Sequence, residues 1–211
     1  FLGSVAAIVL TLVLSRGVGH TLRLLLAGVI VGAVLGAVTH LVLMASPDSL
    51  QAMWAFMLGS TAFVGWVSLV LMVVAWLVSL VAAWLLSRVL DALSLGDATA
   101  QSLGLPVVPM RAALVGVLAL ATGTAVAQTG LIAFVGLAAP HLVRSAIKTT
   151  HGQLIVLASL VGGVLLMAAD TLARWLIAPQ ELPVGVLTAV LGGGYLLWLM
   201  HRGSAKVGGA L

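Results

Sequence analysis

The chain has 211 residues, of which 63% are hydrophobic and only 7% are charged. A water-soluble domain of this length needs more polar surface than such a composition provides, so that class is excluded. Nine Lys and Arg residues outnumber five Asp and Glu residues, but no basic run or aromatic platform accompanies them, which argues against a nucleic-acid partner. Cys is absent, so the chain offers no disulfide and no thiolate metal site.

Long apolar stretches predict an all-α membrane protein whose helices contact lipid. Helices are expected because the bilayer interior satisfies no exposed backbone N–H or C=O group. The first stretch begins at Phe1 without the basic start or the cleavage site of a signal peptide, so we expect the N-terminal part of the protein to be missing. In chain order, seven spans are expected at about residues 1–14, 23–44, 62–86, 112–127, 129–146, 153–172 and 184–200.

Glycines recur at helical packing intervals in two of these spans. Gly28, Gly32 and Gly36 are four residues apart, which predicts one helix face that a neighbouring backbone approaches closely. The alternative is that this face lines a wide pathway, and the two roles are compatible. Gly130 and Gly136 are expected to serve packing in the same way in the span at 129–146.

Residues 46–60, SPDSLQAMWAFMLGS, are too short and too polar at their start to cross a bilayer. They predict an amphipathic helix that lies on the outer surface, with Trp54 and Trp66 at the interface between lipid and water.

Residues 88–111, RVLDALSLGDATAQSLGLPVVPMR, form a long polar insert between two spans. They predict two short helices linked at Gly96 or Gly104, with Ser94 capping the second helix and Asp97 in its first turn. An ordinary connector is one interpretation, but most connections are shorter. The other interpretation is a docking element for a cytoplasmic partner.

The basic residues assign the two sides of the membrane. When the seven spans are threaded alternately, Arg174 lies on one side together with Asp48, Asp170 and Glu181. The other side has far more positive charge, which marks it as cytoplasmic. It receives Arg16, Arg23, Arg88, Arg111, Arg144, Lys148, Arg202 and Lys206.

The segment GLIAFVGLAAPHLVR, residues 130–144, places Pro140 and His141 shortly before a basic residue. We expect these two residues to end the regular helix near the cytoplasmic face. On the outer side, Asp170 and Arg174 are four residues apart. They predict a local ion pair, or alternatively an Arg174 that projects outward to an acidic group of a partner.

Motifs for catalysis are absent from the sequence. The five His residues are scattered, so no metal site is predicted, and there is no HExxH motif and no nucleophile elbow. A phosphate-binding GxxxxGK[ST] loop is also missing. The chain is therefore expected not to be an enzyme and to hold no cofactor, and any ATP that drives it has to bind another subunit.

Several motifs together resemble the FecCD family, the permease subunits of type II ABC importers. They are GLIAFVGLAAPHLVR (130–144), AADTLARW (168–175), ELPVGVLTAVLGG (181–193), LSLGDATAQSLGLP (93–106), LLLAGVIVG (24–32) and MLGSTAFVGW (57–66). The resemblance implies a permease with ten spans in the bacterial inner membrane, of which this chain contains about seven, as a single transmembrane domain over 1–211. It also implies import of a metal chelate such as a ferric siderophore, haem or cobalamin.

The resemblance further implies partners and residue roles. The partners are a second permease copy, two ATPase subunits that bind ATP and Mg, and a periplasmic substrate-binding protein that Arg174 contacts. A cytoplasmic gate is expected at His20, Thr21 and Leu22, and the spans at 23–44 and 184–200 are expected to line the pathway. Coupling to the ATPases is expected at Leu95, Gly96, Asp97, Ala100, Leu103 and Gly104.

Two other classes of function remain open from the residues themselves. A secondary transporter or a channel needs no ATP, although a coupled carrier usually keeps acids at mid-membrane and these spans are almost free of them. A purely structural membrane scaffold would show no substrate-dependent ATP hydrolysis.

Overall fold

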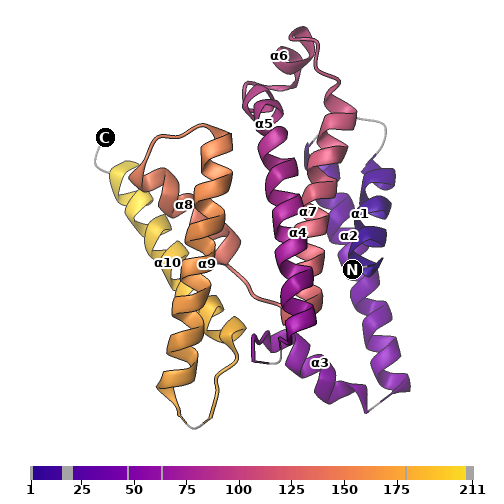
Figure 1. Cartoon of the computed structure of the whole chain (residues 1–211). Coiled ribbons are helices and arrows are strands. Elements are labelled where there is room, and N and C mark those ends of the chain that lie inside the picture. Colours follow the sequence, from indigo (N-terminus) through magenta and orange to yellow (C-terminus); the bar gives the residue numbers. More distant parts are fainter. Residues whose placement is uncertain (1, 16–20, 47, 63, 179, 208–211) are drawn as a thin grey trace. The chain divides into compact units, whose positions relative to one another are not determined.

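The computed structural model is helical, with no strand in the ranges that it describes (Figure 1). These ranges are residues 2–15, 21–46, 48–62, 64–178 and 180–207. Contacts between residues divide the chain into two units, which are described separately. The first unit comprises Phe1–Trp54 and Gly65–Gln128, and the second comprises Ala55–Val64 and Thr129–Leu211.

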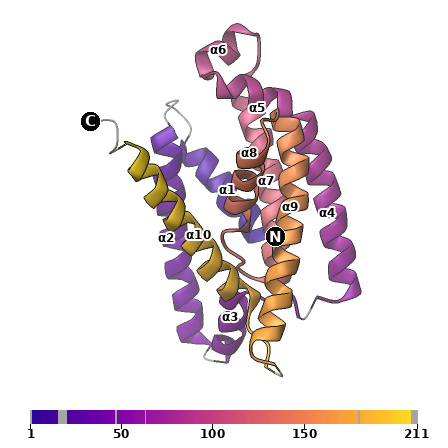
Figure 2. The same ribbon diagram turned by 90° about the vertical axis from the view of Figure 1, so that its left-hand side faces the viewer.

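The first unit contains two packed helices followed by a long helical excursion. Helices α1 (Leu2–Ser15) and α2 (Thr21–Ala45) pack against each other, and α3 (Ser49–Leu58) crosses the division between the units. The excursion rises through α4, passes through two short helices beyond its end and returns through α7 (Figures 1 and 2). Its elements are α4 (Trp66–Leu85), α5 (Ser87–Ser94), α6 (Asp97–Ser102) and α7 (Val107–Thr129).

The second unit is built on one long helix. Helix α9 (His151–Leu176) packs against both α8 (Val135–Ala146) and α10 (Val184–Val207). The segment Ala55–Val64, from the end of α3 onward, belongs to the same unit.

Helices occur at all seven places where spans are expected, and the short helix expected within 46–60 is confirmed as α3. Helix α7 begins earlier than expected, at Val107, and contains Pro109 in its first turn. Proline is tolerated there because the first N–H groups of a helix have no partner within it. Among the described residues, four helical stretches are long and apolar enough to cross a membrane: Leu26–Ala45, Trp66–Leu85, Val107–Thr129 and His151–Leu176.

The expectation of one continuous helix over 129–146 is wrong. The backbone leaves the helix at Gly130, with φ of 72°, and α8 begins only after Phe134, with φ of 68°. The 12 residues of α8 extend about 18 Å, which is short of the ~30 Å hydrocarbon core. Hydropathy does not distinguish an apolar helix from an apolar segment in another conformation, and the glycine permits the left-handed turn.

Pro140 and His141 do not end the helix, contrary to expectation, because α8 continues to Ala146. Proline removes the N–H that would bond to the carbonyl of Gly136, but the helix resumes in the next turn. His141 instead contacts α10, with its Nδ1 3.1 Å from the hydroxyl of Tyr195 and the two rings edge-on.

Three glycines allow backbone segments of the second unit to meet at close range. We call Gly59, Gly130 and Gly185 the glycine junction. A Cβ added to Gly130 or Gly185 would overlap the backbone carbonyl oxygen of Phe56 or Leu58, respectively, and one added to Gly59 would overlap that of Leu131. Three backbone hydrogen bonds join the crossing segments. The amide of Leu131 donates to the carbonyl of Phe56 (2.9 Å), that of Ser60 to the carbonyl of Thr129 (2.8 Å), and that of Gly185 to the carbonyl of Gly59 (3.2 Å). The junction fixes the end of α3 and the starts of α8 and α10 within one unit.

Candidate functional site

The insert of the first unit is a compact pair of short helices. Ala100 of α6 has no exposed surface and packs with Ala92 of α5 and Val107 of α7, while Leu93 and Leu105 pack at the margin. This small apolar cluster holds α5 and α6 against the beginning of α7. The pair is therefore a structured element rather than an extended connector.

The two short helices within 88–111 are confirmed, and Gly96 (φ 103°) links them. Asp97 lies in the first turn of α6, as expected, and Gly104 (φ 79°) follows its end. Ser94 does not cap α6, contrary to expectation. The link is so short that Ser94 remains the last residue of α5, where its hydroxyl donates to the carbonyl of Asp91 (2.6 Å).

An ion pair joins α6 to α7. Nη2 of Arg111 donates to both carboxylate oxygens of Asp97, at 2.8 and 3.1 Å. Both side chains are about two-fifths exposed, so the pair adds little to global stability and mainly sets the orientation of α6. Sequence reasoning placed Arg111 only by its charge, because no periodic pattern links residues that flank a turn.

The six residues expected to couple to an ATPase divide into two groups. Leu95 and Leu103 are 67% and 63% exposed, and Gly96 and Gly104 are exposed beside them. Ala100 and Asp97 support the helix pair instead, because Ala100 is buried inside it and Asp97 is held in the ion pair with Arg111. The insert thus presents leucine side chains to its surroundings at the two turns that flank α6.

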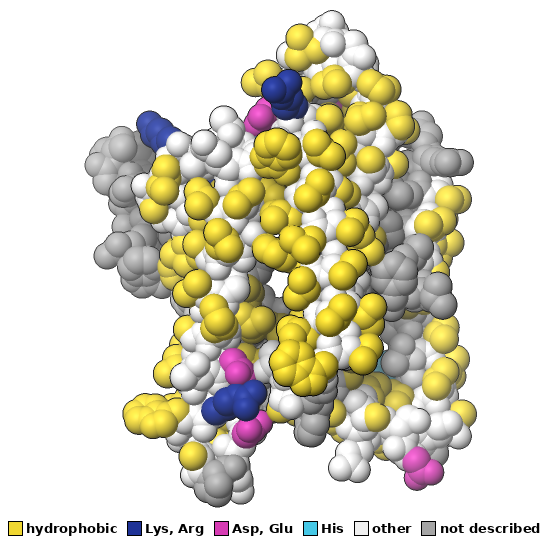
Figure 3. Space-filling view, in the orientation of Figure 1, with side chains coloured by type: hydrophobic (Ala, Val, Ile, Leu, Met, Phe, Trp, Pro, Cys, Tyr) yellow, Lys and Arg dark blue, Asp and Glu magenta, His cyan; other side chains and the backbone are white. Residues whose placement is uncertain are grey.

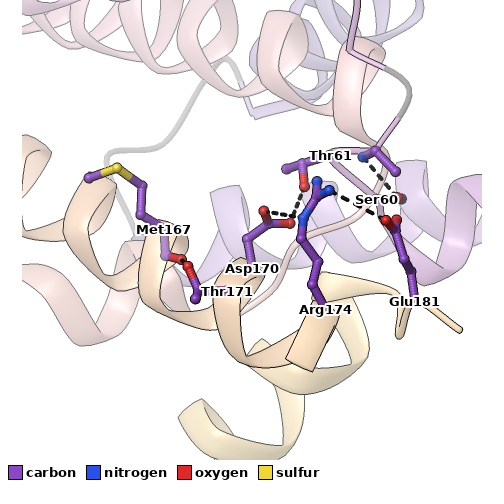
Figure 4. Close-up of polar contacts among 8 residues, drawn as sticks. Ser60, Thr61, Met167, Asp170, Thr171, Arg174 and Glu181 are labelled. Atoms are coloured by element: carbon purple, nitrogen blue, oxygen red, sulfur yellow. Dashed lines mark hydrogen bonds and ion pairs between the residues drawn. The ribbon is translucent and has the colours of Figure 1, made fainter. Parts of the chain in front are cut away.

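A charged cluster lies at the last turns of α9 in the second unit (Figure 4). Nε of Arg174 donates to Oδ2 of Asp170 (2.9 Å), and its Nη1 lies 3.4 Å from Oε1 of Glu181. The hydroxyl of Thr61 donates to Oδ1 of Asp170. The predicted ion pair of Arg174 with Asp170 is therefore formed. The Arg174 side chain is still 47% exposed, so it can also reach an acidic group of a partner, which is the alternative interpretation.

Sequence reasoning missed Thr61 as a member of this cluster. It lies 109 residues from Asp170 along the chain and reaches α9 from the segment after the glycine junction. Thr61 lies in the motif MLGSTAFVGW, which resembles the family, but the motif does not indicate that Thr61 contacts Asp170.

Charges are placed toward both ends of α9. Arg144 lies in the last turn of α8 and Lys148 precedes α9, whereas Arg174 lies 23 residues after His151, the first residue of α9, which is about 35 Å along the helix axis. Figure 3 shows hydrophobic side chains on the visible helix flanks and charged side chains toward helix ends. This distribution suits a helix that crosses the hydrocarbon core.

Other expected residues have no role defined by their contacts. His20 lies outside the described residues, and Thr21 and Leu22 begin α2 with side chains that are not described. An added Cβ at Gly28 would meet Thr11 of α1 at 4.0 Å, but at Gly32, Gly36 and Gly136 it would meet no described atom within 4 Å. Close packing at those three glycines therefore remains a prediction. In the described part of the chain no group of His, Asp and Glu is placed to hold a metal ion.

The apolar helices, with charges toward their ends and a structured polar insert, define a multi-pass membrane protein. Its sequence matches the FecCD transport family over residues 1–202. The chain belongs to this family of transport permeases.

Named relatives and a solved structure agree with this assignment. The chain is 41% identical to the hemin transport system permease protein HmuU of Yersinia pestis, over 96% of this chain and 61% of the relative. It is 37% identical to the vitamin B12 import system permease protein BtuC of Vibrio cholerae (95% and 61%) and 33% identical to the Fe(3+) dicitrate transport system permease protein FecD of Escherichia coli (96% and 63%). A structure described as an inward-facing conformation of a metal-chelate type ABC transporter superposes with a TM-score of 0.85 at 28% identity, over 92% of this chain and 63% of that one. The chain spans about three-fifths of the length of these relatives.

Proposed function

We propose that this chain forms the greater part of a permease subunit of an ABC importer, which carries a metal chelate across the bacterial inner membrane into the cytoplasm. The match to the FecCD transport family over residues 1–202 carries this proposal. The relatives named above are permeases for hemin, vitamin B12 and Fe(3+) dicitrate. A ferric siderophore, haem or cobalamin is accordingly the proposed class of cargo.

The proposed assembly contains two permease copies and two ATPase subunits. The permease provides no phosphate-binding loop, so ATP and Mg bind the ATPases and hydrolysis occurs there. The exposed leucines beside α6 are the proposed contact with an ATPase, and the buried cluster around Ala100 transmits its movement to α4 and α7. Coupling then arises because the closed ATPase pair contacts one arrangement of the helices better than the other.

The outer side of the permease is proposed to receive a substrate-binding protein through Arg174. This residue is half-exposed at the end of α9 that lies away from Arg144 and Lys148, and a guanidinium is well suited to a carboxylate of the partner. The cytoplasmic gate remains assigned to His20, Thr21 and Leu22, next to the spans proposed to line the pathway.

Reconstitution of the complete transporter tests the proposal. We expect vesicles that contain two permeases and two ATPases to take up labelled haem, cobalamin or a ferric siderophore only when ATP is present. Uptake by the permease without ATPases would instead support a secondary transporter or a channel. A protein that carries none of the three cargoes in either condition would contradict the import function.

Replacing Arg174 by Glu is expected to weaken docking of the substrate-binding protein about tenfold or more, because a third carboxylate would then repel the partner's acidic group. Association with the ATPases should not change, since the substitution lies at the other end of α9 from Arg144 and Lys148. Titration of the reconstituted transporter with labelled binding protein measures the first quantity, and co-purification of the ATPases measures the second. Unaltered docking would contradict the assignment of Arg174.

A further inference from the structure

The two carboxylates that face Arg174 are held very differently. Asp170 is 28% exposed and both of its oxygens are occupied, one by the hydroxyl of Thr61 and the other by Nε of Arg174 at 2.9 Å. Glu181 is 50% exposed, and its contact with Nη1 of Arg174 is 3.4 Å long. Charge-assisted hydrogen bonds are ordinarily about 2.7–2.9 Å, so only the contact with Asp170 has that length.

This asymmetry assigns different roles to the two edges of the guanidinium. Asp170, itself held by the hydroxyl of Thr61, accepts from the Nε edge and thereby orients the fork (Figure 4). The Nη edge carries further N–H donors that the contact with Glu181 does not use. A carboxylate that approached this edge could bind in the bidentate geometry that an arginine fork favours.

The backbone around Glu181 is anchored on both sides. The amide of Gln180 donates to the carbonyl of Ile177 (2.9 Å), and that of Leu182 donates to the carbonyl of Ala173 in α9 (3.3 Å). Further along, Gly185 is fixed in the glycine junction. The Glu181 side chain therefore projects from a held segment, and its own rotation is enough to release Arg174.

We infer that Glu181 is an internal competitor that occupies Arg174 until a carboxylate of the substrate-binding protein displaces it, while Asp170 and Thr61 keep the guanidinium oriented. This inference rests on the proposed docking role of Arg174. Exchange of one surface carboxylate for another costs little, since exposed ion pairs are weak. Glu181 thus lowers the affinity of docking and favours release of the binding protein after delivery.

The competitor role is tested with Glu181→Gln in the complete transporter, reconstituted in nanodiscs and titrated with its labelled substrate-binding protein. The substitution removes a competing charge, so docking should become about two- to fivefold tighter. Asp48→Asn is the matched control, because it removes the same charge from another segment expected on the outer side. An equal gain in both variants, or no gain for Glu181→Gln, overturns the inference.

A second variant tests the positioning role. Asp170→Asn is expected to weaken docking, because the Nε edge of Arg174 loses its charged partner, although it too removes a negative charge from the site. A gain in affinity for this variant contradicts the positioning role. If Glu181→Gln fails to assemble with the ATPases, Glu181→Ala serves the same comparison.

These outcomes separate the inference from the function on which it rests. If Arg174→Glu docks normally, the docking role itself fails. If Arg174→Glu loses docking but Glu181→Gln behaves as the wild type, only the competitor role fails.

Discussion

Replacing Gly130 by Ala is expected to destabilise the second unit by about 2–4 kcal/mol. Two costs combine at this position. The backbone has φ of 72°, which an L-residue with a Cβ adopts only with strain, and the new methyl would overlap the carbonyl oxygen of Phe56. That oxygen belongs to a backbone held by the amide of Leu131, so it has little freedom to move aside. Unfolding of the purified permease by SDS titration in micelles measures the loss.

Gly136→Ala is the matched control, since it adds the same methyl six residues further along the chain, within α8. Its Cβ meets no described atom within 4 Å, and alanine is favoured over glycine inside a helix by about 0.5–1 kcal/mol. The control should therefore be neutral or slightly stabilising. Equal stability of the two variants would show that the glycine junction does not restrict the fold.

The positions of the helices follow from sequence, but the break before α8 does not. Continuous apolar stretches identify membrane helices because lipid requires both an apolar surface and an internally bonded backbone. Residues 130–134 are as apolar as their neighbours, yet Gly130 is buried against the backbone of Phe56, and the amide of Leu131 donates to the carbonyl of Phe56 in place of a helical hydrogen bond. The sequence predicts packing at Gly130, but the contact is with Phe56, which no local pattern indicates.

The charged cluster was predictable only where its members share one helix. The spacing of Asp170 and Arg174 places both on one face of α9, so their ion pair follows from helical geometry. Thr61 joins through the fold of the second unit, and the ion pair of Asp97 with Arg111 depends on a turn. Long-range contacts of this kind depend on how segments pack, which spacing along the chain does not specify.

Replacing Ala100 by Glu is expected to unfold the insert and to abolish its association with the ATPases. Ala100 has no exposed surface and packs with Ala92 and Val107. All members of this cluster are apolar, so none of them offers a cation to a buried carboxylate. Burial of an unpaired charge costs about 3–5 kcal/mol, which exceeds what a cluster of a few small side chains contributes. Limited proteolysis of the solubilised permease reports unfolding of the insert, and co-purification reports the ATPases.

Ala98→Glu provides the comparison, because it introduces the same charge on the same short helix at an exposed position. The insert of this variant should resist protease as the wild type does, since its carboxylate remains in water. If the two variants are cleaved equally, the buried cluster does not hold α5 and α6 together. A protease-resistant Ala100→Glu permease that still binds its ATPases would show that the buried cluster is needed neither for the fold of the insert nor for association with the ATPases. Under the proposed function, the two variants therefore test whether coupling depends on the interior of the helix pair as well as on the leucines proposed to contact the ATPase.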